Sequence, residues 1–165
     1  MSIADRIRLI EVRKTAVGRG LFAQSDFAAE TILGEVLGEV RPNDHYSDYC
    51  IDMGGKALLE PERPFRFLNH SCEPNSELIQ WKEQRVDGVR LPRLWVKTLR
   101  DIAVGEELTI DYAWSADQAI ECMCGSAKCR GFVVAATERV IHRARRMGID
   151  RQRKARLKNR KQAGK

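Results

Sequence analysis

The sequence has 165 residues, which is enough for one compact domain, and 43% of them are hydrophobic, which suffices for a core. No stretch approaches the roughly 20 apolar residues that a membrane-spanning helix needs. The first residues, MSIADRIRLIEVRK, lack the apolar segment of a secretion signal. The composition therefore excludes a fibrous or membrane-spanning chain and predicts an intracellular globular protein.

Charge is distributed unevenly along the chain. Residues 138–165 contain 12 Lys or Arg and two acidic residues, a net charge of +10, whereas residues 1–137 contain 17 basic and 21 acidic residues, a net charge of −4. An acidic body favours a cationic peptide as partner, and a basic tail favours nucleic acid or another polyanion. The tail is equally consistent with a solvated helix that binds nothing specific.

The pattern of apolar and turn-forming residues predicts mostly strands. Short strands are expected at residues 7–13, 20–24, 31–40, 49–53, 94–99 and within 105–114, with a loop at 41–48 and glycine-induced bends in 31–40. Only residues 138–160, rich in Arg, Lys, Ala, Gln and Leu, have helical character. These features predict a single mainly-β domain with a C-terminal helix.

Three of the five cysteines lie within eight residues. Cys122, Cys124 and Cys129 have C-x-C-x4-C spacing, and such a thiolate cluster is typical of a soft, tetrahedral metal ion such as structural zinc. Three unrelated thiols are the alternative. The fourth ligand must lie elsewhere, and Cys72, in a turn-rich loop, is a better candidate than Cys50, which lies in a strand-like run where a buried thiol is ordinary.

Three shorter motifs are weak indicators of function when each is considered alone. Gly18-Arg19-Gly20 is a flexible turn in many proteins, Asn69-His70 could be a capped turn with a core histidine, and Tyr112 could be a core aromatic. Together with the cysteines they occur in a specific order: GRG at 18–20, RFLNHSCEPN at 66–75, GEELTIDY at 105–112 and CMCGSAKCRG at 122–131. In this order the motifs resemble the SET domain of protein lysine methyltransferases with its cysteine-rich post-SET segment.

The resemblance covers residues 7–134 and implies a division of the chain. A SET domain is expected at 7–117, a post-SET zinc segment at 118–134 and a basic helical tail at 135–165. The implied fold consists of small curved sheets, with a C-terminal segment that threads beneath a loop to form a pseudoknot. The family's fourth zinc ligand is the cysteine of N-H-S-C, here Cys72.

The resemblance also implies a cofactor, S-adenosylmethionine, and the residues that bind it. Tyr112 is expected to be the catalytic residue, with its hydroxyl at the end of a narrow channel where the substrate lysine meets the methyl donor. Ile110 is expected to line that channel. The expected cofactor-binding residues are Gly18, Arg19, Gly20, Tyr49, Arg66, Asn69, His70 and Phe132.

Two positions depart from the family pattern. Val36 occupies a position where the family usually has a tyrosine, which removes one wall of the usual aromatic cage. Ile110 stands where the family has a phenylalanine or tyrosine that limits how many methyl groups fit, so more than one methyl group is expected to be added.

The sequence therefore predicts a lysine methyltransferase that uses S-adenosylmethionine and acts on a basic protein, such as a histone or a DNA-associated protein. Two alternatives remain: a non-catalytic SET-like binding module, or a nucleic-acid-associated protein acting through residues 138–165. The expected location is the cytoplasm of a bacterial cell, or the nucleus and chromatin of a eukaryotic one.

Overall fold

The computed structural model describes most of the chain as two compact units. The described residues are 1–45, 47–54, 56–137, 139–148 and 151. Unit 1 comprises residues 1–69 and 74–110, and unit 2 comprises residues 70–73 and those from 111 onward. Each unit is described by itself.

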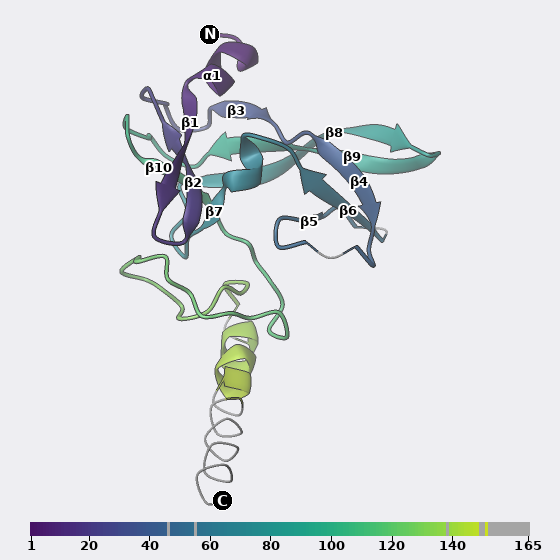
Figure 1. The fold of residues 1–165 in the computed structure, drawn as a ribbon, viewed down its shortest axis with the longest axis vertical. Coiled ribbons are helices and arrows are strands. Elements are labelled where there is room, and N and C mark those ends of the chain that lie inside the picture. Colours follow the sequence, from purple (N-terminus) through teal and green to yellow (C-terminus); the bar gives the residue numbers. More distant parts are fainter. Residues whose placement is uncertain (46, 55, 138, 149–150, 152–165) are drawn as a thin grey trace, which may run out of the picture. The chain divides into compact units, whose positions relative to one another are not determined.

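Strands dominate unit 1, where the described residues form three small sheets (Figure 1). The first has the order β1 (Ile10–Thr15), β2 (Gly18–Ala23), β10 (Glu107–Ile110) and β7 (Asn69–His70), and the boundary between the units falls within β7. The second has the order β3 (Ile32–Glu35), β9 (Val89–Thr98) and β8 (Ser76–Val86). The third has the order β4 (Gly38–Pro42), β6 (Ala57–Pro61) and β5 (Ile51–Asp52). A short 3₁₀ helix, η1, spans Phe65–Phe67.

The core of unit 1 is aliphatic and contributed by several strands and loops. Leu21, Leu33, Val96, Ile102 and Leu108 are each at most 1% exposed, and burying a side chain of this size stabilises a fold by about 1.5–3 kcal/mol. The mainly-β fold class predicted from the sequence is therefore confirmed.

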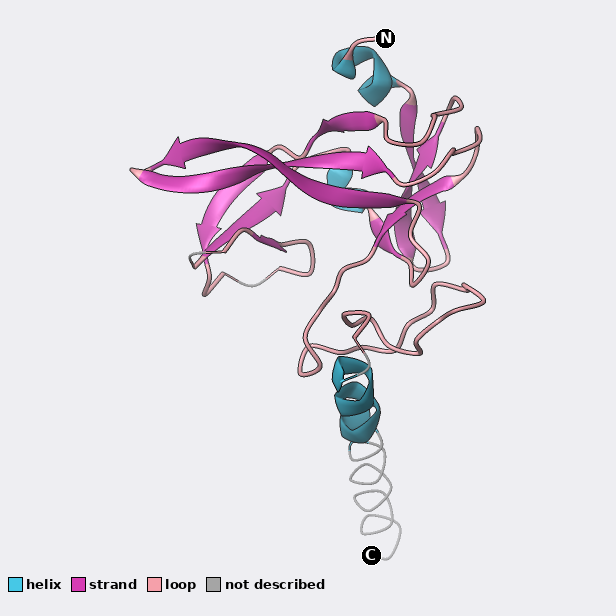
Figure 2. Ribbon diagram, turned by 180° about the vertical axis from the view of Figure 1, so that it is seen from behind, coloured by secondary structure: helices cyan, strands magenta, loops and turns pink. Residues whose placement is uncertain are grey.

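The longest paired strands were only partly predicted. Strands β8 and β9 form a twisted antiparallel hairpin (Figure 2), of which the sequence analysis predicted only the end at 94–99. The hairpin turns at Asp87 and Gly88, which have φ values of 49° and 81°. Two successive positive φ values are typical of the tight turn that matches the right-handed twist of paired strands.

Two further differences concern the first 42 residues. The predicted strand at 31–40 is split into β3 and β4, because the chain leaves one sheet after Glu35 and enters another at Gly38. A short helix that was not predicted, α1 (Ile3–Arg8), precedes β1. Its first turn is closed by a capping box between Ser2 and Asp5, which satisfies backbone N–H groups that would otherwise lack partners.

Unit 2 consists mainly of loop followed by a helix (Figure 2). Its small core contains Ala116, Ala119, Val134 and Ala144, and a single bridge joins Glu121 to Phe132. Residues 139–148 are helical, as is 151, and the rest of the predicted 138–160 helix lies outside the described residues. No helix within the described part of the chain is long and apolar enough to cross a membrane. The predicted domain boundaries and pseudoknot remain predictions.

Candidate active site and metal centre

In unit 1, the beginning of strand β2 lies against Asn69, the first residue of the NHSC motif. The Asn69 side-chain amide donates hydrogen bonds to the carbonyl of Arg19 at 2.9 Å and to the Glu107 carboxylate at 2.7 Å. A Cβ atom on Gly20 would overlap the Glu107 carboxylate and approach Asn69 Nδ2 to 3.0 Å. Glycine at position 20 is therefore required by the close packing of three elements.

Glycine is favoured at position 18 for a different reason, which is the conformation of its backbone. Its φ of 122° is a conformation that side-chain-bearing residues rarely adopt, and a Cβ built there meets nothing within 4 Å. The backbone at Gly18 is thus open to an approaching ligand. Next to it, the Arg19 guanidinium lies 5.6 Å from the centre of the Phe67 ring, within the range of a cation–π interaction.

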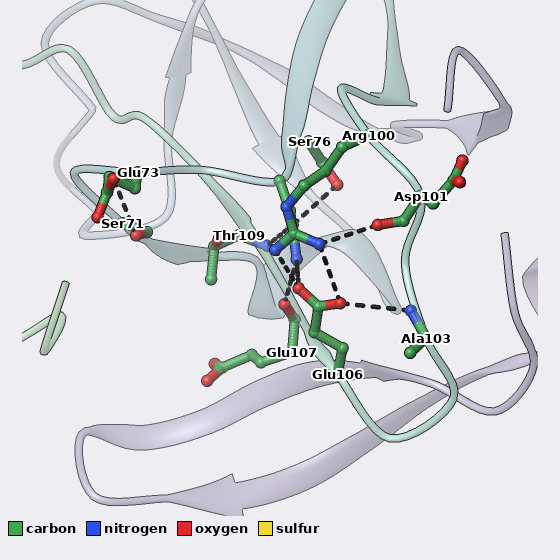
Figure 3. Close-up of polar contacts among 10 residues, drawn as sticks. Ser71, Glu73, Ser76, Arg100, Asp101, Ala103, Glu106, Glu107 and Thr109 are labelled. Carbon is green, nitrogen blue, oxygen red and sulfur yellow. Dashed lines mark hydrogen bonds and ion pairs between the residues drawn. The ribbon is translucent and has the colours of Figure 1, made fainter. Parts of the chain in front are cut away.

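A second set of hydrogen bonds in unit 1 fixes the beginning of β10, and the sequence analysis did not identify it (Figure 3). The buried Asn75 amide donates to the Glu107 carbonyl at 2.7 Å and to the Glu106 carboxylate at 3.0 Å, and its oxygen accepts from the Thr109 N–H at 2.9 Å. Arg100 pairs with the same Glu106 carboxylate. No pattern in the sequence marks these partners; the burial of Asn75, which makes such partners necessary, is seen only in the structure.

Tyr49 and Arg66, both predicted to contact the cofactor, lie together in unit 1. The Arg66 guanidinium stacks on the Tyr49 ring with its carbon 3.9 Å from the ring centre. Arg66 also forms an ion pair with Glu60 and donates to the Pro61 carbonyl at 3.3 Å. The ion pair and the stacking together hold the Arg66 side chain in place.

In unit 2, Tyr112 is held through its backbone. Its N–H donates to Nδ1 of His70 at 3.2 Å, and its ring lies 5.5 Å from the His70 ring and 5.3 Å from the Trp114 ring, between centres. The preceding residue, Asp111, forms an ion pair with Arg130, with 2.7 Å between the carboxylate oxygen and the guanidinium nitrogen. The Arg130 side chain is 9% exposed, so this pair is largely shielded from water.

His70 connects Tyr112 with the cysteine cluster. Burial lowers the pKa of His70 and outweighs the opposite effect of Asp111, and Arg130 adds a smaller lowering, so the imidazole is neutral at pH 7. Because Nδ1 accepts from Tyr112, the ring proton resides on Nε2, which lies 3.4 Å from Cys72 Sγ. His70 can therefore donate this proton to a thiolate at position 72.

The four cysteines that were expected to share a metal ion lie together in unit 2. The Sγ atoms of Cys72, Cys122, Cys124 and Cys129 all lie within 4.8 Å of one another, and those of Cys72 and Cys122 are 3.8 Å apart. A tetrahedral zinc ion with bonds of about 2.3 Å holds its sulfur ligands about 3.8 Å apart. The donor set and its spacing therefore fit zinc.

Backbone N–H groups and burial set the state of these thiols. Arg130 N–H points to Cys72 Sγ at 3.3 Å and Gly131 N–H to Cys129 Sγ at 3.4 Å. Burial raises the pKa of Cys72 and Cys122. For Cys124 burial acts in the same direction, but backbone hydrogen bonds from Cys72 and Ser126, together with the Cys122 and Cys129 thiols, outweigh it and lower the pKa to about 7. Cys124 is therefore more readily ionised than Cys72 and Cys122.

The remaining residues singled out from the sequence have clear packing roles. Phe132 packs against the small alanine-rich core of unit 2. Ile110, at the end of β10, and Val36, between β3 and β4, are both buried in unit 1. Cys50, the alternative fourth ligand, lies in unit 1 and hydrogen-bonds to Glu60 at 3.1 Å. The structure therefore groups Cys72, and not Cys50, with the other three cysteines.

Comparison with known proteins decides the family. The model of the SET domain matches residues 18–113, more than half of the chain. The chain belongs to the SET-domain family. The resemblance inferred from the sequence motifs is thus confirmed.

Relatives of this SET domain are named histone-lysine N-methyltransferases. Ash1 of Drosophila melanogaster is 32% identical over 141 residues, 74% of this chain and 6% of the relative. An H3 lysine-4 specific enzyme of Emericella nidulans is 47% identical over 134 residues, 69% of this chain and 11% of the relative. Human SETD2 is 34% identical over 139 residues, 70% of this chain and 5% of the relative. The chain thus spans only a small part of each of these proteins.

A solved structure has the same fold as this SET domain. KRYPTONITE, in a complex with mCHH DNA, an H3(1–15) peptide and SAH, matches with a TM-score of 0.67 and 25% sequence identity. The match covers 75% of this chain and 29% of that chain. Small sheets like those of unit 1 are therefore shared with a SET-domain protein in a complex with a histone peptide.

Proposed function

We propose that this SET domain transfers methyl groups from S-adenosylmethionine to lysine side chains of a basic protein, with a histone as the preferred class. The observation that carries the proposal is the SET-domain match at 18–113, together with relatives named histone-lysine N-methyltransferases. The net charge of −4 over residues 1–137 suits a cationic peptide. Association with chromatin follows if the chain works in a eukaryotic nucleus.

The chain's own residues fit the cofactor. Gly18 leaves open space beside an exposed backbone, which favours close approach by a ligand. Arg66 and Tyr49 offer a held cation and an aromatic face, and Asn69 is fixed by two hydrogen bonds. We assign cofactor binding to the whole predicted set: Gly18, Arg19, Gly20, Tyr49, Arg66, Asn69, His70 and Phe132.

The methyl transfer requires a neutral lysine amine. S-adenosylmethionine supplies, when bound, an electrophilic methyl group on a positively charged sulfur. A free lysine has a pKa of about 10.4, so about 0.1% or less is neutral at pH 7, and an apolar channel lowers that pKa by excluding water. Tyr112 then orients the amine, and alignment of this kind supplies several kcal/mol of the barrier reduction. His70 fixes the position of Tyr112 through the backbone hydrogen bond.

In this proposal, a zinc ion bound by four thiolates holds the segment after Tyr112 in place. Zinc bound by Cys72, Cys122, Cys124 and Cys129 has four sulfur ligands and no open position, so its role is structural. Its binding replaces thiol protons, which favours the segment's folded form. Arg130, which follows the ligand Cys129, reaches Asp111 and thereby links this segment to the residue before Tyr112.

The direct test is incubation of the full chain with labelled S-adenosylmethionine and a panel of basic proteins, including histone H3. Label in a histone lysine, located by mass spectrometry, is the expected result. Calorimetric titration with S-adenosylmethionine distinguishes the enzyme from a non-catalytic binding module, since a module without a cofactor site gives no binding heat. Cofactor binding without label in any basic protein would contradict the proposed activity.

Ile110 is proposed to let the enzyme add more than one methyl group. It is an aliphatic residue, 6% exposed, and lacks the bulk and hydroxyl of the tyrosine found at this position in some family members. Exhaustive reaction followed by mass spectrometry should give dimethyl or trimethyl lysine. Ile110→Tyr should shift the product toward monomethyl lysine, and monomethyl product alone from the unaltered protein would contradict the proposal.

A second candidate function is non-specific nucleic-acid binding by the tail. Residues 138–165 carry a net charge of +10, and contacts between such a segment and phosphates weaken steeply with salt. Truncation after Arg151 removes seven of the 12 basic residues and keeps the helical residues that pack in unit 2. The truncated protein should bind duplex DNA more weakly and with a smaller salt dependence. Equal binding of DNA by both proteins would show that the removed part of the tail does not bind nucleic acid.

A further inference from the structure

One group of metal-ligating side chains lies outside the four-thiol cluster. His45, Cys50 and Glu60 each offer a ligand atom, and these three atoms lie within 4.8 Å of one another. All three residues belong to unit 1 and are half-buried. Glu60 lies in β6, whereas His45 and Cys50 lie in the loop between β4 and β5.

The two loop residues converge on a single oxygen atom. His45 Nε2 lies 3.2 Å from Glu60 Oε2, and Cys50 Sγ lies 3.1 Å from the same atom. Tetrahedral zinc, with bonds of roughly 2.0–2.3 Å, would set these separations at about 3.3 Å and about 3.5 Å. The two separations from Glu60 Oε2 therefore need to lengthen by only a few tenths of an ångström for zinc binding, and all three ligand atoms already lie within 4.8 Å of one another.

The other oxygen of Glu60 is already used in a way that suits a ligand. Arg66 pairs with Oε1 and leaves Oε2 for the two loop residues. A carboxylate that binds a metal through one oxygen commonly accepts a hydrogen bond at the other, which fixes its orientation. Hydrogen bonds from Cys50, Ser47, Arg66 and His45 outweigh the effect of burial and lower the pKa of Glu60 to about 2, so the carboxylate is charged at neutral pH.

We propose that His45, Cys50 and Glu60 form a second zinc site, distinct from the four-thiol site, with water as the fourth ligand. His45 binds through Nε2 with its proton on Nδ1, Glu60 binds through Oε2, and Cys50 binds as a thiolate. The proton lost by Cys50 passes to the solvent. The mixed nitrogen, sulfur and oxygen donors match the ligand types that zinc accepts.

The second site would act on the cofactor-binding residues beside it. Tyr49 precedes Cys50 directly, and its ring stacks on Arg66, the partner of Glu60. An ion that ties Cys50 to Glu60 fixes the segment that carries Tyr49. This consequence rests on the proposed role of Tyr49 and Arg66 in S-adenosylmethionine binding, whereas the metal site itself does not.

The test is a count of bound metal in the full chain. The protein is titrated with zinc chloride after dialysis against metal-free buffer, and bound zinc is measured by elemental analysis. The unaltered protein should bind two zinc ions. Cys50→Ser keeps a hydrogen-bond donor to Glu60 but is a poor zinc ligand, so it should bind one, whereas the control Glu62→Gln, at an exposed position beside the site, should bind two.

Two outcomes would overturn the proposal. One zinc ion in the unaltered protein would mean that the three residues form only a hydrogen-bonded group. Two ions in Cys50→Ser would mean that the second ion binds elsewhere. Both results are independent of methyl transfer, so they remain informative if the proposed enzyme activity fails.

A second measurement tests the consequence for the cofactor. With the four-thiol site already filled, added zinc should tighten S-adenosylmethionine binding to the unaltered protein by about fivefold, near the lower end of typical coupling between sites. The same addition should leave the affinity of Cys50→Ser unchanged. An equal effect on both proteins would show that zinc acts through another site.

Discussion

Units 1 and 2 are stabilised by different kinds of interaction. Unit 1 has paired strands and an aliphatic core that includes Leu21, Leu33 and Leu108. The described part of unit 2 has an isolated bridge between Glu121 and Phe132 and a buried core of three alanines and one valine, against which a few larger, partly buried side chains pack. A core of this size contributes little hydrophobic stabilisation. Unit 2, which carries Tyr112, must therefore depend on its cysteine cluster and buried ion pair.

The largest expected effect comes from breaking the cysteine cluster. Cys122→Ser, or a strong chelator, should disorder unit 2 and abolish methyl transfer, since structural zinc sites contribute about 10–16 kcal/mol of apparent binding free energy. Hydrogen exchange should show loss of protection in residues 111–137, while the strands of unit 1 stay protected. Cys50→Ser should retain protection in 111–137. Equal loss of protection in both units would contradict the contrast between them.

Tyr112→Phe should have the next largest effect. It should lower the rate of methyl transfer and leave stability unchanged. The hydroxyl orients the amine, and misalignment of reacting groups costs about 100-fold in rate. The backbone N–H that bonds to His70 is retained, so the thermal midpoint and the zinc content should not change. Steady-state kinetics with a histone substrate would measure the loss in kcat. A folded, cofactor-binding Tyr112→Phe protein with the normal rate would refute the catalytic role.

Arg130 allows a finer test of what orders unit 2. Arg130→Gln removes the ion pair with Asp111, and loss of a largely buried pair costs about 3 kcal/mol. We expect kcat to fall about tenfold through displacement of the neighbouring Tyr112, with little change in the KM for S-adenosylmethionine. Arg130→Lys keeps the charge and should restore part of the rate. A Gln variant that loses zinc would show that Arg130 supports the metal cluster instead.

The cysteine cluster and the family were predictable from the sequence because their signals are local. Cys122, Cys124 and Cys129 need a fourth thiol, and Cys72 was the better of two candidates; the structure groups it with them. The motifs at 18–20, 66–75 and 105–112 were informative through their order. Local spacing and chemical type were enough in both cases.

Contacts between residues far apart in the chain were not predictable. Asn75 bonds to Glu106 and Thr109, more than 30 positions away, and no pattern in the sequence marks such a pairing. Most of the β8–β9 hairpin was not predicted although Asp87-Gly88 is a strong turn signal, because charged residues obscure the alternation in its strands. The link from His70 to both Tyr112 and Cys72 also required the fold.

The smallest effect should come from Gly20, within the strand-built unit. In Gly20→Ala the new methyl group would displace Glu107 or Asn69, and overpacking of this kind costs about 1–3 kcal/mol. Gly88→Ala is a matched control, because its φ of 81° brings backbone strain but its Cβ meets nothing within 4 Å. Denaturant unfolding should show destabilisation in both, but only Gly20→Ala should also weaken S-adenosylmethionine binding, since Asn69 is one of the proposed cofactor contacts. If both variants bound the cofactor normally, the packing around Gly20 would serve stability alone.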